Sequence, residues 1–183
     1  NAVLCLDRQG KTLWTTQVGS EKPGKHKKAT GSNPSAVTDG KHVFVYFKSG
    51  DLACLDLTGK IEWEQNLQAK FGEDTLWWDL GTSPVLTQSH VVVAVMHSGP
   101  SFLVAFEKNS GKQAWKQDRN LGAPSEAAQS YSTPVVLKEG EKELLVVLGA
   151  DHVTAHEAAS GRELWRVGGL NPTGHQYFRS IAS

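Results

Sequence analysis

The stretch Gly111-Lys112-Gln113-Ala114-Trp115 decides the fold, because the same five-residue pattern returns three more times along the chain. Each copy begins with a glycine and ends with a tryptophan, and the four tryptophans lie 49, 52 and 50 residues apart. A period of this length is typical of solenoid or propeller units. The 183-residue chain is therefore expected to be one continuous array of repeats. The paired positions are Gly10 and Trp14, Gly59 and Trp63, Gly111 and Trp115, and Gly161 and Trp165.

The pattern extends upstream of each glycine, where a small residue, a larger residue and an acid precede a tight turn. This order predicts a strand, a glycine turn and a second strand that carries the tryptophan. We expect each tryptophan to fill the seam between neighbouring units, so that truncation to alanine costs roughly 3–5 kcal/mol. The four upstream copies are Cys5-Leu6-Asp7, Cys54-Leu55-Asp56, Ala105-Phe106-Glu107 and Ala155-His156-Glu157.

Further apolar runs, separated by turn residues, complete each unit as four short strands. Such units predict an all-β fold, a β-propeller segment of four-stranded antiparallel blades. Both ends cut through a repeat and no signal peptide is recognisable, so the chain is interpreted as a segment of a longer protein. We expect a partial blade over 1–18, blades over about 34–66, 83–118 and 133–168, and the start of a further blade over 178–183.

Composition and charge exclude several classes of function. Lys and Arg together number 19, as do Asp and Glu, so the chain has no electrostatic footprint for nucleic acid. The longest apolar run, Val91 to Met96, is far too short to span a bilayer. Cys5 and Cys54 stand where the other repeats carry alanine, which indicates small, buried, reduced thiols rather than a disulfide or a zinc site.

The sequence from Ala105 to Trp115 resembles the tryptophan-docking motif of the pyrroloquinoline-quinone-type β-propeller repeat family, the quinoprotein alcohol dehydrogenase-like propellers. That motif reads Ala-x-Asp-x-x-x-Gly-Lys-x-x-Trp, and this copy departs from it only by Glu for Asp. Ala155 to Trp165 adds Arg for Lys, and the two earlier copies have one residue fewer in the turn. The resemblance covers essentially the whole chain and implies rings of commonly about eight blades. Missing blades or a second copy are then needed to close the ring.

In a four-stranded blade, the loops that leave the second and fourth strands share one face, here called the loop face. The loops between blades are about fifteen residues long, whereas the turns of the opposite face, here called the turn face, are short and generic. We therefore expect function on the loop face. Its candidate ligand residues are His26, Trp77, Trp78, Asp79, His97, Tyr131, His175 and Arg179, accompanied by Lys25, Lys27, Lys28, Lys48, Asp74, Arg119, Glu126, Gln129, Asp151, His152 and Tyr177.

Alternatives stay open for these candidates. Trp77-Trp78-Asp79 suits a ligand surface, because large aromatics are costly to leave in a loop, but one tryptophan could instead plug the central channel while Asp79 caps a turn. His26, His97 and His175 lack the paired spacing of metal ligands, so surface or hydrogen-bonded histidines are the default. Arg179 either holds a carboxylate or phosphate or forms a structural salt bridge.

The resemblance implies two main classes of function. The first is a noncatalytic binding or scaffold module of a bacterial exported or cell-envelope protein, which holds a protein, peptide or saccharide; a lipoprotein of the outer-membrane β-barrel assembly machinery has such repeats without a cofactor. The second is part of a quinoprotein dehydrogenase that oxidises alcohols or sugars with pyrroloquinoline quinone and calcium. A purely structural module is a third class.

The family's large alcohol dehydrogenases place the quinone against adjacent cysteines, which this chain lacks, and no calcium-binding set of Asn, Glu and Asp can be transferred to it. We therefore expect the noncatalytic class, with no catalytic, cofactor-binding or metal residue in this chain, and a periplasmic or cell-envelope location by resemblance. An open array exposes two apolar blade edges, so we also predict dimerisation or poor solubility.

Overall fold

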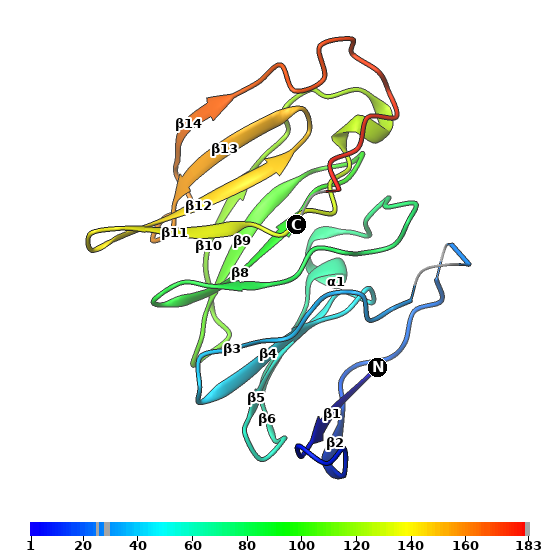
Figure 1. The fold of residues 1–183 in the computed structure, drawn as a ribbon, viewed down its shortest axis with the longest axis vertical. Coiled ribbons are helices and arrows are strands. Elements are labelled where there is room, and N and C mark those ends of the chain that lie inside the picture. Colours follow the sequence, from blue (N-terminus) through cyan, green and yellow to red (C-terminus); the bar gives the residue numbers. More distant parts are fainter. Residues whose placement is uncertain (25, 28–29, 182–183) are drawn as a thin grey trace.

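The computed structural model describes residues 1–24, 26–27 and 30–181. Three sheets of four antiparallel strands follow one another along the chain, after a two-stranded sheet at the N-terminal end. Figure 1 shows the sheets fanned side by side in chain order, with β1 and β2 at one end and β14 at the other. The arrangement confirms the predicted β-propeller segment of four-stranded antiparallel blades.

The strands of each sheet are neighbours in chain order, so every connection within a sheet is a hairpin. The two-stranded sheet holds β1 (Ala2–Leu6) and β2 (Thr12–Gln17). The first sheet holds β3 (Val37–Thr38), β4 (His42–Tyr46), β5 (Asp51–Asp56) and β6 (Ile61–Asn66). The second sheet holds β7 (Val85–Leu86), β8 (His90–Val95), β9 (Phe102–Glu107) and β10 (Gln113–Asp118). The third sheet holds β11 (Val135–Glu139), β12 (Lys142–Gly149), β13 (His152–Glu157) and β14 (Glu163–Val167).

The middle strands of the second sheet, β8 and β9, are buried along almost their whole length. Their sequences, HVVVAV and FLVAFE, are nearly continuous apolar runs, as expected of strands that are covered on both faces. In β1 burial alternates from residue to residue, because only one face of that strand is covered by a neighbouring sheet. The sheets therefore pack face to face, and the core lies in the seams between them.

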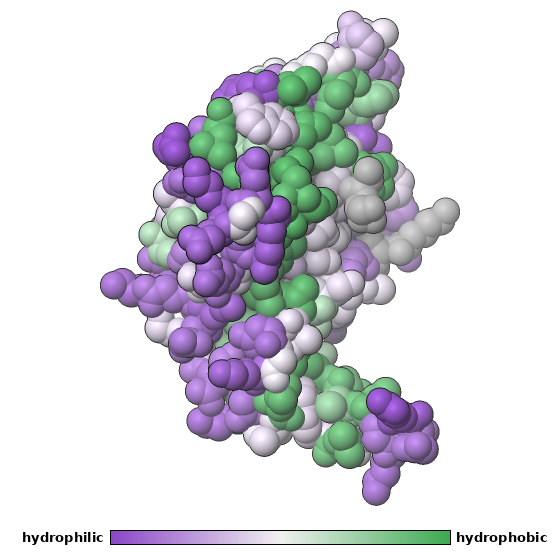
Figure 2. All heavy atoms as spheres, turned by 60° about the vertical axis from the view of Figure 1, so that its left-hand side comes forward, coloured by the Kyte–Doolittle hydropathy of each residue, from purple (hydrophilic) through white to green (hydrophobic). Residues whose placement is uncertain are grey.

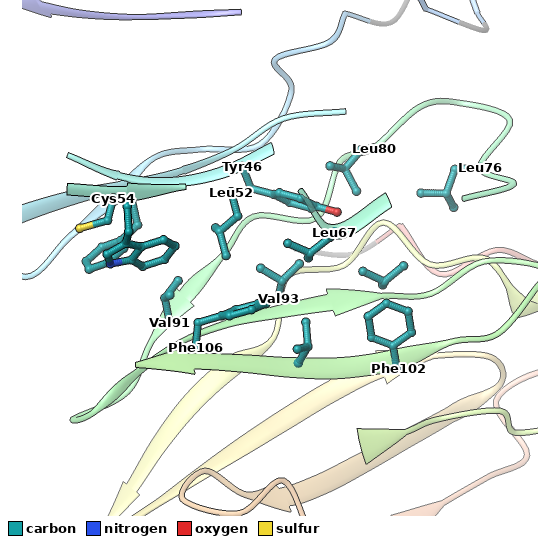
Figure 3. Close-up of a cluster of buried hydrophobic side chains, with 14 residues drawn as sticks. Tyr46, Leu52, Cys54, Leu67, Leu76, Leu80, Val91, Val93, Phe102 and Phe106 are labelled. Carbon is teal, nitrogen blue, oxygen red and sulfur yellow. The ribbon is translucent and has the colours of Figure 1, made fainter. Parts of the chain in front are cut away.

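The largest core cluster lies in the seam between the first and second sheets. Figure 3 shows Tyr46 and Leu52 of the first sheet facing Val93 and Phe106 of the second. Leu67, which follows β6, is packed into the same cluster. Full burial of such side chains is worth about 1.5–3 kcal/mol each, so this seam is a main source of stability.

Three repeat tryptophans reach across a seam to the next sheet. Each indole N–H donates to a backbone carbonyl of the following glycine turn, and each ring lies against that turn's glycine. A Cβ on those glycines would approach the ring to 2.4–2.6 Å, which explains why glycine is required there. Trp165 differs, since it is 46% exposed and no sheet follows it in the residues that the structure describes. The pairs are Trp14 with Leu57 O (3.0 Å) and Gly59, Trp63 with Lys108 O (2.7 Å) and Gly111, and Trp115 with Ala158 O (3.2 Å) and Gly161.

Two short helical turns interrupt the long loops and were not anticipated from the sequence. The α-helix α1 (Leu67–Phe71) follows β6, and Asn66 caps it by accepting a hydrogen bond from Ala69 N at 2.8 Å. The 3-10 helix η1 (Ser125–Ala128) lies between β10 and β11. No helix within the described ranges is long and apolar enough to cross a membrane.

Both cysteines are free thiols, as expected, but they differ in burial. Cys54 is buried in the seam between the first and second sheets. Cys5 is partly exposed, because the two-stranded sheet that carries it is narrower than a complete blade and covers less of the seam.

Candidate functional site

Trp78 is the point at which four long loops meet. It lies in the loop between α1 and β7, and its ring centroid is 4.2 Å from that of His26, which belongs to the loop before β3. Its backbone N–H donates to the hydroxyl oxygen of Tyr131 at 3.3 Å, from the loop before β11. Arg179, from the segment after β14, places its guanidinium carbon 5.6 Å from the Trp78 ring centroid. The structure thus gathers four of the predicted ligand residues in one place.

The aromatic side chains at this place remain exposed. Trp77 is 56% and Trp78 41% exposed in spite of the contacts around them. Tyr177 and Phe178 occupy the equivalent positions two repeats later and are also exposed, whereas the repeat between them carries the small pair Ala127-Ala128. The loop face therefore presents large aromatic rings to solvent beside a charged guanidinium, a combination that protein surfaces rarely leave without a function.

Asp79 supports this surface from below and is itself buried. One carboxylate oxygen forms an ion pair with Lys48, and both side chains are at most 2% exposed. The other oxygen accepts a hydrogen bond from His26 N at 3.2 Å. Lys48 Nζ also donates to Pro23 O at 2.5 Å. Because buried charges require partners, this pair ties two loops together and fixes the backbone beside Trp78; neither residue is an exposed ligand contact.

Tyr131 continues the support on the other side of Trp78. Its hydroxyl accepts from Trp78 N and donates to Gln129 Oε1 at 2.9 Å, and Gln129 Nε2 donates to Ser98 Oγ at 3.1 Å. Desolvation raises the pKa of the Tyr131 hydroxyl, so the group stays protonated and keeps both bonds at neutral pH. Tyr131 is therefore a positioning residue of the surface.

Arg179 is held by Glu126, which forms an ion pair with its guanidinium. The segment that carries Arg179 lies beside η1, because Ala127 N of η1 donates to Gln176 O at 2.9 Å, and Tyr131 N donates to Ser180 O at 3.0 Å. Of the two interpretations left open for Arg179, the ion pair with Glu126 favours the structural salt bridge. The same guanidinium contributes a cation–π contact to Trp78.

Two predicted ligand residues do not join this surface. His97 is buried, its Nδ1 accepts from Thr75 N at 3.2 Å, and its Nε2 lies 2.9 Å from Pro100 O, to which it donates. Both ring nitrogens are thus used in holding the loop. His175 is exposed, and its Nδ1 accepts from Tyr177 N at 3.3 Å. Lys25 and Lys28, named with the loop-face candidates, lie outside the described residues.

Arg119 is a further loop-face candidate that is not exposed on that face. It was expected beside the candidate residues, but the structure buries it to 1% exposure between the second and third sheets. A small cleft of about 140 Å³ lies beside it and His97.

Two larger clefts open on the turn face, which the sequence analysis set aside. One of about 890 Å³ is bordered by Asp39, Gln88 and Glu141, from the first hairpin turns of three sheets. One of about 290 Å³ lies between the second and third sheets and includes His90 and Arg162. No single turn reveals these clefts in the sequence, because their walls come from different sheets.

The family model described as outer membrane protein assembly factor BamB matches residues 1–178. The chain belongs to this family. Its similarity to solved structures also confirms the resemblance to propellers of the quinone-dependent type. These structures include a quinohemoprotein alcohol dehydrogenase, ADHIIG, from Pseudomonas putida HK5, with 18% identity and a TM-score of 0.66 over 91% of this chain and 31% of that chain.

Two further structures have the same fold. The quinohemoprotein alcohol dehydrogenase from Comamonas testosteroni has 14% identity and a TM-score of 0.65, over 91% of this chain and 32% of that chain. BamB from Moraxella catarrhalis has 17% identity and a TM-score of 0.55, over 86% of this chain and 40% of that chain. At these identities the likeness shows the fold alone, and this BamB-family chain spans less than half the length of each protein. No curated protein sequence matches the chain.

The quinone-dependent relatives raise the question of whether this BamB-family chain could hold a quinone and calcium. Within residues 1–24, 26–27 and 30–181, no three His, Cys, Asp or Glu side chains lie together as a possible metal site. Cys5 and Cys54 lie in different sheets and cannot form the adjacent pair expected beside a quinone. The described residues do not fit this pair of cofactors, and we derive no reaction step through them.

Proposed function

We propose that the chain is a noncatalytic recognition module of a bacterial exported or cell-envelope protein, which binds a protein, peptide or saccharide through its loop face. The observation that supports this proposal is the exposure of Trp77 and Trp78 at the meeting point of four loops. Exposed tryptophans with a neighbouring arginine are the residue types that dominate the binding energy of recognition surfaces.

The surface is rigid as well as exposed. The buried Lys48–Asp79 ion pair, the Tyr131 hydroxyl and the Arg179 guanidinium each hold Trp78 or its backbone from a different direction. An aromatic side chain that is already ordered loses little conformational entropy when a partner binds. These contacts therefore increase the affinity that the Trp78 ring can supply.

Membership in a family described as an outer membrane protein assembly factor supports a location in the cell envelope. The sheets do not close into a ring within the described residues. The zero formal charge argues against nucleic acid as the partner.

The test uses immobilised peptide and oligosaccharide arrays as probes, followed by titration of the strongest ligand against the purified chain. We expect Trp77→Ala and Trp78→Ala each to weaken binding at least about tenfold. Leu57→Ala, which removes an equally exposed apolar side chain from the turn face, is the matched control and should bind like the wild type. Binding that survives both tryptophan substitutions, or no binding to either array, would overturn the proposal.

The dehydrogenase alternative is tested separately. The chain is incubated with pyrroloquinoline quinone and calcium and dialysed; its visible spectrum and dye-linked oxidation of alcohols and sugars are then measured. We expect neither retained quinone nor turnover. Retained quinone with turnover would replace the noncatalytic proposal by the dehydrogenase one.

A further inference from the structure

The cleft of about 290 Å³ on the turn face lies in the seam between the second and third sheets, and its walls include Gln88, Glu143 and Ala158. Both sheets have all four strands in the described residues, so both walls of the cleft are complete. Figure 2, in which the left-hand side of Figure 1 comes forward, shows hydrophilic side chains gathered on this side of the molecule. We call this cleft the Ala158 cleft.

Lys108 stands in the preceding seam, between the first and second sheets, where Ala158 stands in this one. The carbonyl oxygens of both residues accept a hydrogen bond from the repeat tryptophan of the sheet before, at 2.7 and 3.2 Å. The backbone N–H of Lys108 donates to Ser89 O at 3.3 Å, and that of Ala158 donates to Glu143 O at 3.0 Å. The two backbone positions are therefore equivalent, and the seams differ here in the side chain.

The lysine side chain fills its own seam. The Lys108 side chain is 18% exposed, and its ammonium nitrogen lies 3.9 Å from Asp39 Oδ2, in the first hairpin turn of the first sheet. Ala158 has neither the methylene groups nor the ammonium of this lysine. The Ala158 cleft lies where they would be, and Gln88 borders it from the first hairpin turn of the second sheet. The exchange of lysine for alanine thus accounts for the cleft.

A carboxylate nevertheless remains in the seam that lacks the lysine. Glu143 stands where the second sheet has Ser89, and its side chain is only 12% exposed. Its Oε2 accepts from Gln88 N at 2.6 Å. Its Oε1 lies 3.8 Å from the ammonium of Lys138, whose side chain is 77% exposed, so this ion pair contributes little. A largely buried carboxylate is stabilised by a nearby positive charge, which the preceding seam has in Lys108.

The other walls of the Ala158 cleft suit an aliphatic chain that ends in a positive charge. Leu144 and Leu164 give the cleft apolar surface. Three glutamates border it against two basic residues, Lys142 and Arg162, so acidic side chains are in excess. Arg162 is 3.6 Å from Glu157, with which it forms an ion pair. A lysine side chain has this combination of an apolar stem and a charged end.

We propose that the Ala158 cleft binds the side chain of a lysine from another polypeptide. The methylene groups of that lysine lie on Ala158 and Leu144, and its ammonium donates to the Glu143 carboxylate. The occupant is a lysine because a lysine of this chain fills the preceding seam from the equivalent backbone position. The site lies on the turn face and is independent of the recognition function proposed for the loop face.

The probe is Nα-acetyl-lysine methylamide, which carries one lysine side chain on a peptide backbone. It is titrated into the isotope-labelled 183-residue chain and followed by NMR. We expect the amide signals of Ala158 and Ala159 to shift, with a Kd of about 1 mM. The norleucine analogue has a similar aliphatic chain without the ammonium. It should bind at least about tenfold more weakly, because a charge-assisted hydrogen bond is lost.

Two substitutions exchange the two seams. Ala158→Lys supplies the missing side chain from within the chain and should abolish binding; the fold accepts it because Lys108 stands at the equivalent position. Lys108→Ala should open a second lysine site in the preceding seam. Glu143→Gln keeps a hydrogen-bond acceptor but removes the charge, so it should weaken binding about tenfold. Glu64→Gln, which changes an exposed glutamate of β6, is the matched control and should bind like the wild type.

No shift with the lysine probe at about 10 mM would overturn the proposal, as would equal binding of the norleucine analogue. Undiminished binding to Ala158→Lys or Glu143→Gln would also overturn it. If Lys108→Ala created no second site, the equivalence of the two seams on which the proposal rests would fail. Tighter binding of cadaverine, which carries the same ammonium without a peptide backbone, would assign the cleft to free amines instead. Circular dichroism of each variant establishes that its strands are intact.

Discussion

The seam between the first and second sheets and the seam between the second and third sheets share one backbone plan but differ in chemistry. Both contain a tryptophan on the glycine of the next turn. At three equivalent positions, however, the first of these seams is apolar and the second is polar. The apolar positions are Leu67, Val104 and Phe106, and their polar counterparts are Arg119, Thr154 and His156.

Arg119 fills the polar seam, and no carboxylate of the described residues forms an ion pair with it. Its Nε donates to Thr154 Oγ1 at 2.9 Å, and its two Nη atoms donate to three backbone carbonyls of the third sheet and to the sulfur of Met96. All five of its N–H groups thereby have an acceptor. Burial lowers the pKa of Arg119 to about 10, which leaves the guanidinium charged at neutral pH. The carbonyls are those of Val147, Gly149 and His152, at 3.1–3.2 Å.

Thr154 and His156 extend these bonds into a directed chain. Gly161 O can only accept, so the neutral imidazole of His156 carries its proton on Nδ1, and its Nε2 accepts the hydroxyl hydrogen of Thr154, 2.9 Å away. His156 Nδ1–H then donates to Gly161 O at 3.0 Å, in the turn on which Trp115 lies. The apolar seam is stabilised by packing and burial. The polar seam also requires one tautomer of His156 and one orientation of the Thr154 hydroxyl. The comparison shows that the same arrangement of blades can be built with an apolar seam or with a hydrogen-bonded polar one.

The largest effect is expected for Trp63→Ala in the apolar seam. Trp63 is 8% exposed and packs between the rings of Phe44 and Phe106, so its truncation should cost roughly 3–5 kcal/mol of unfolding free energy. Trp115→Ala should cost less, because Trp115 is only half-buried in the polar seam. Urea unfolding of both variants measures the difference. An equal or larger cost for Trp115→Ala would contradict the greater role of burial in the apolar seam.

The next largest effect is expected for Arg119→Ala. This variant leaves Thr154 Oγ1 and three buried carbonyls without their donors and opens a cavity, so we expect a loss of about 2–4 kcal/mol in urea unfolding. Arg166→Ala removes an exposed arginine from the same sheet and is the control, with no measurable change expected. A loss below about 1 kcal/mol for Arg119→Ala would show that the bonds in the polar seam add little.

The polar seam should also make the fold sensitive to acid. Burial lowers the pKa of His156 below its ordinary value of 6.5. Below about pH 6.5, His156 therefore binds a proton in the unfolded chain but not in the folded chain. The free energy of unfolding falls as the pH drops through this range, by at most about 1.4 kcal/mol per pH unit. Urea unfolding between pH 5 and 8 measures this slope. His156→Phe, which installs the residue of the apolar seam, should flatten it, and an unchanged slope would assign the acid sensitivity to other groups.

The smallest effect is expected when all three polar residues are exchanged together. Arg119→Leu, Thr154→Val and His156→Phe convert the polar seam into the apolar one. Because a buried polar network can be replaced by apolar residues with little or no loss, the triple variant should lie within about 1 kcal/mol of the wild type or be more stable. Thermal unfolding monitored by circular dichroism tests this. A loss as large as that of Arg119→Ala alone would show that the two seams are not interchangeable.

Much of the fold could be predicted from the sequence, because the signals are local. The turn glycines, the preceding acids and the tryptophans lie within eleven residues of one another, and their spacing specifies strands and hairpins directly. The helix α1 was missed because five residues give too short a periodic pattern, although Asn66 at its N-cap was a possible signal. The burial of Arg119 also had a signal, since it stands four residues after Trp115 just as Leu67 stands four residues after Trp63.

The candidate site was predicted in part. The sequence placed His26, Trp78, Tyr131 and Arg179 on one face because they belong to loops that leave the same ends of their sheets. It could not tell that Asp79 is buried against Lys48, or that both ring nitrogens of His97 are engaged in its loop. These contacts join residues from different loops, and no spacing in the sequence encodes them.

The sequence by itself determined the repeat, the four-stranded sheets and the face on which the long loops lie, because hairpins and their turns depend on residues close together in the chain. Only the tertiary structure decided that Arg119 is buried and that the larger clefts lie on the turn face. The physical reason is that burial and hydrogen-bond partners are set by the neighbouring sheet, which lies about fifty residues away in the chain.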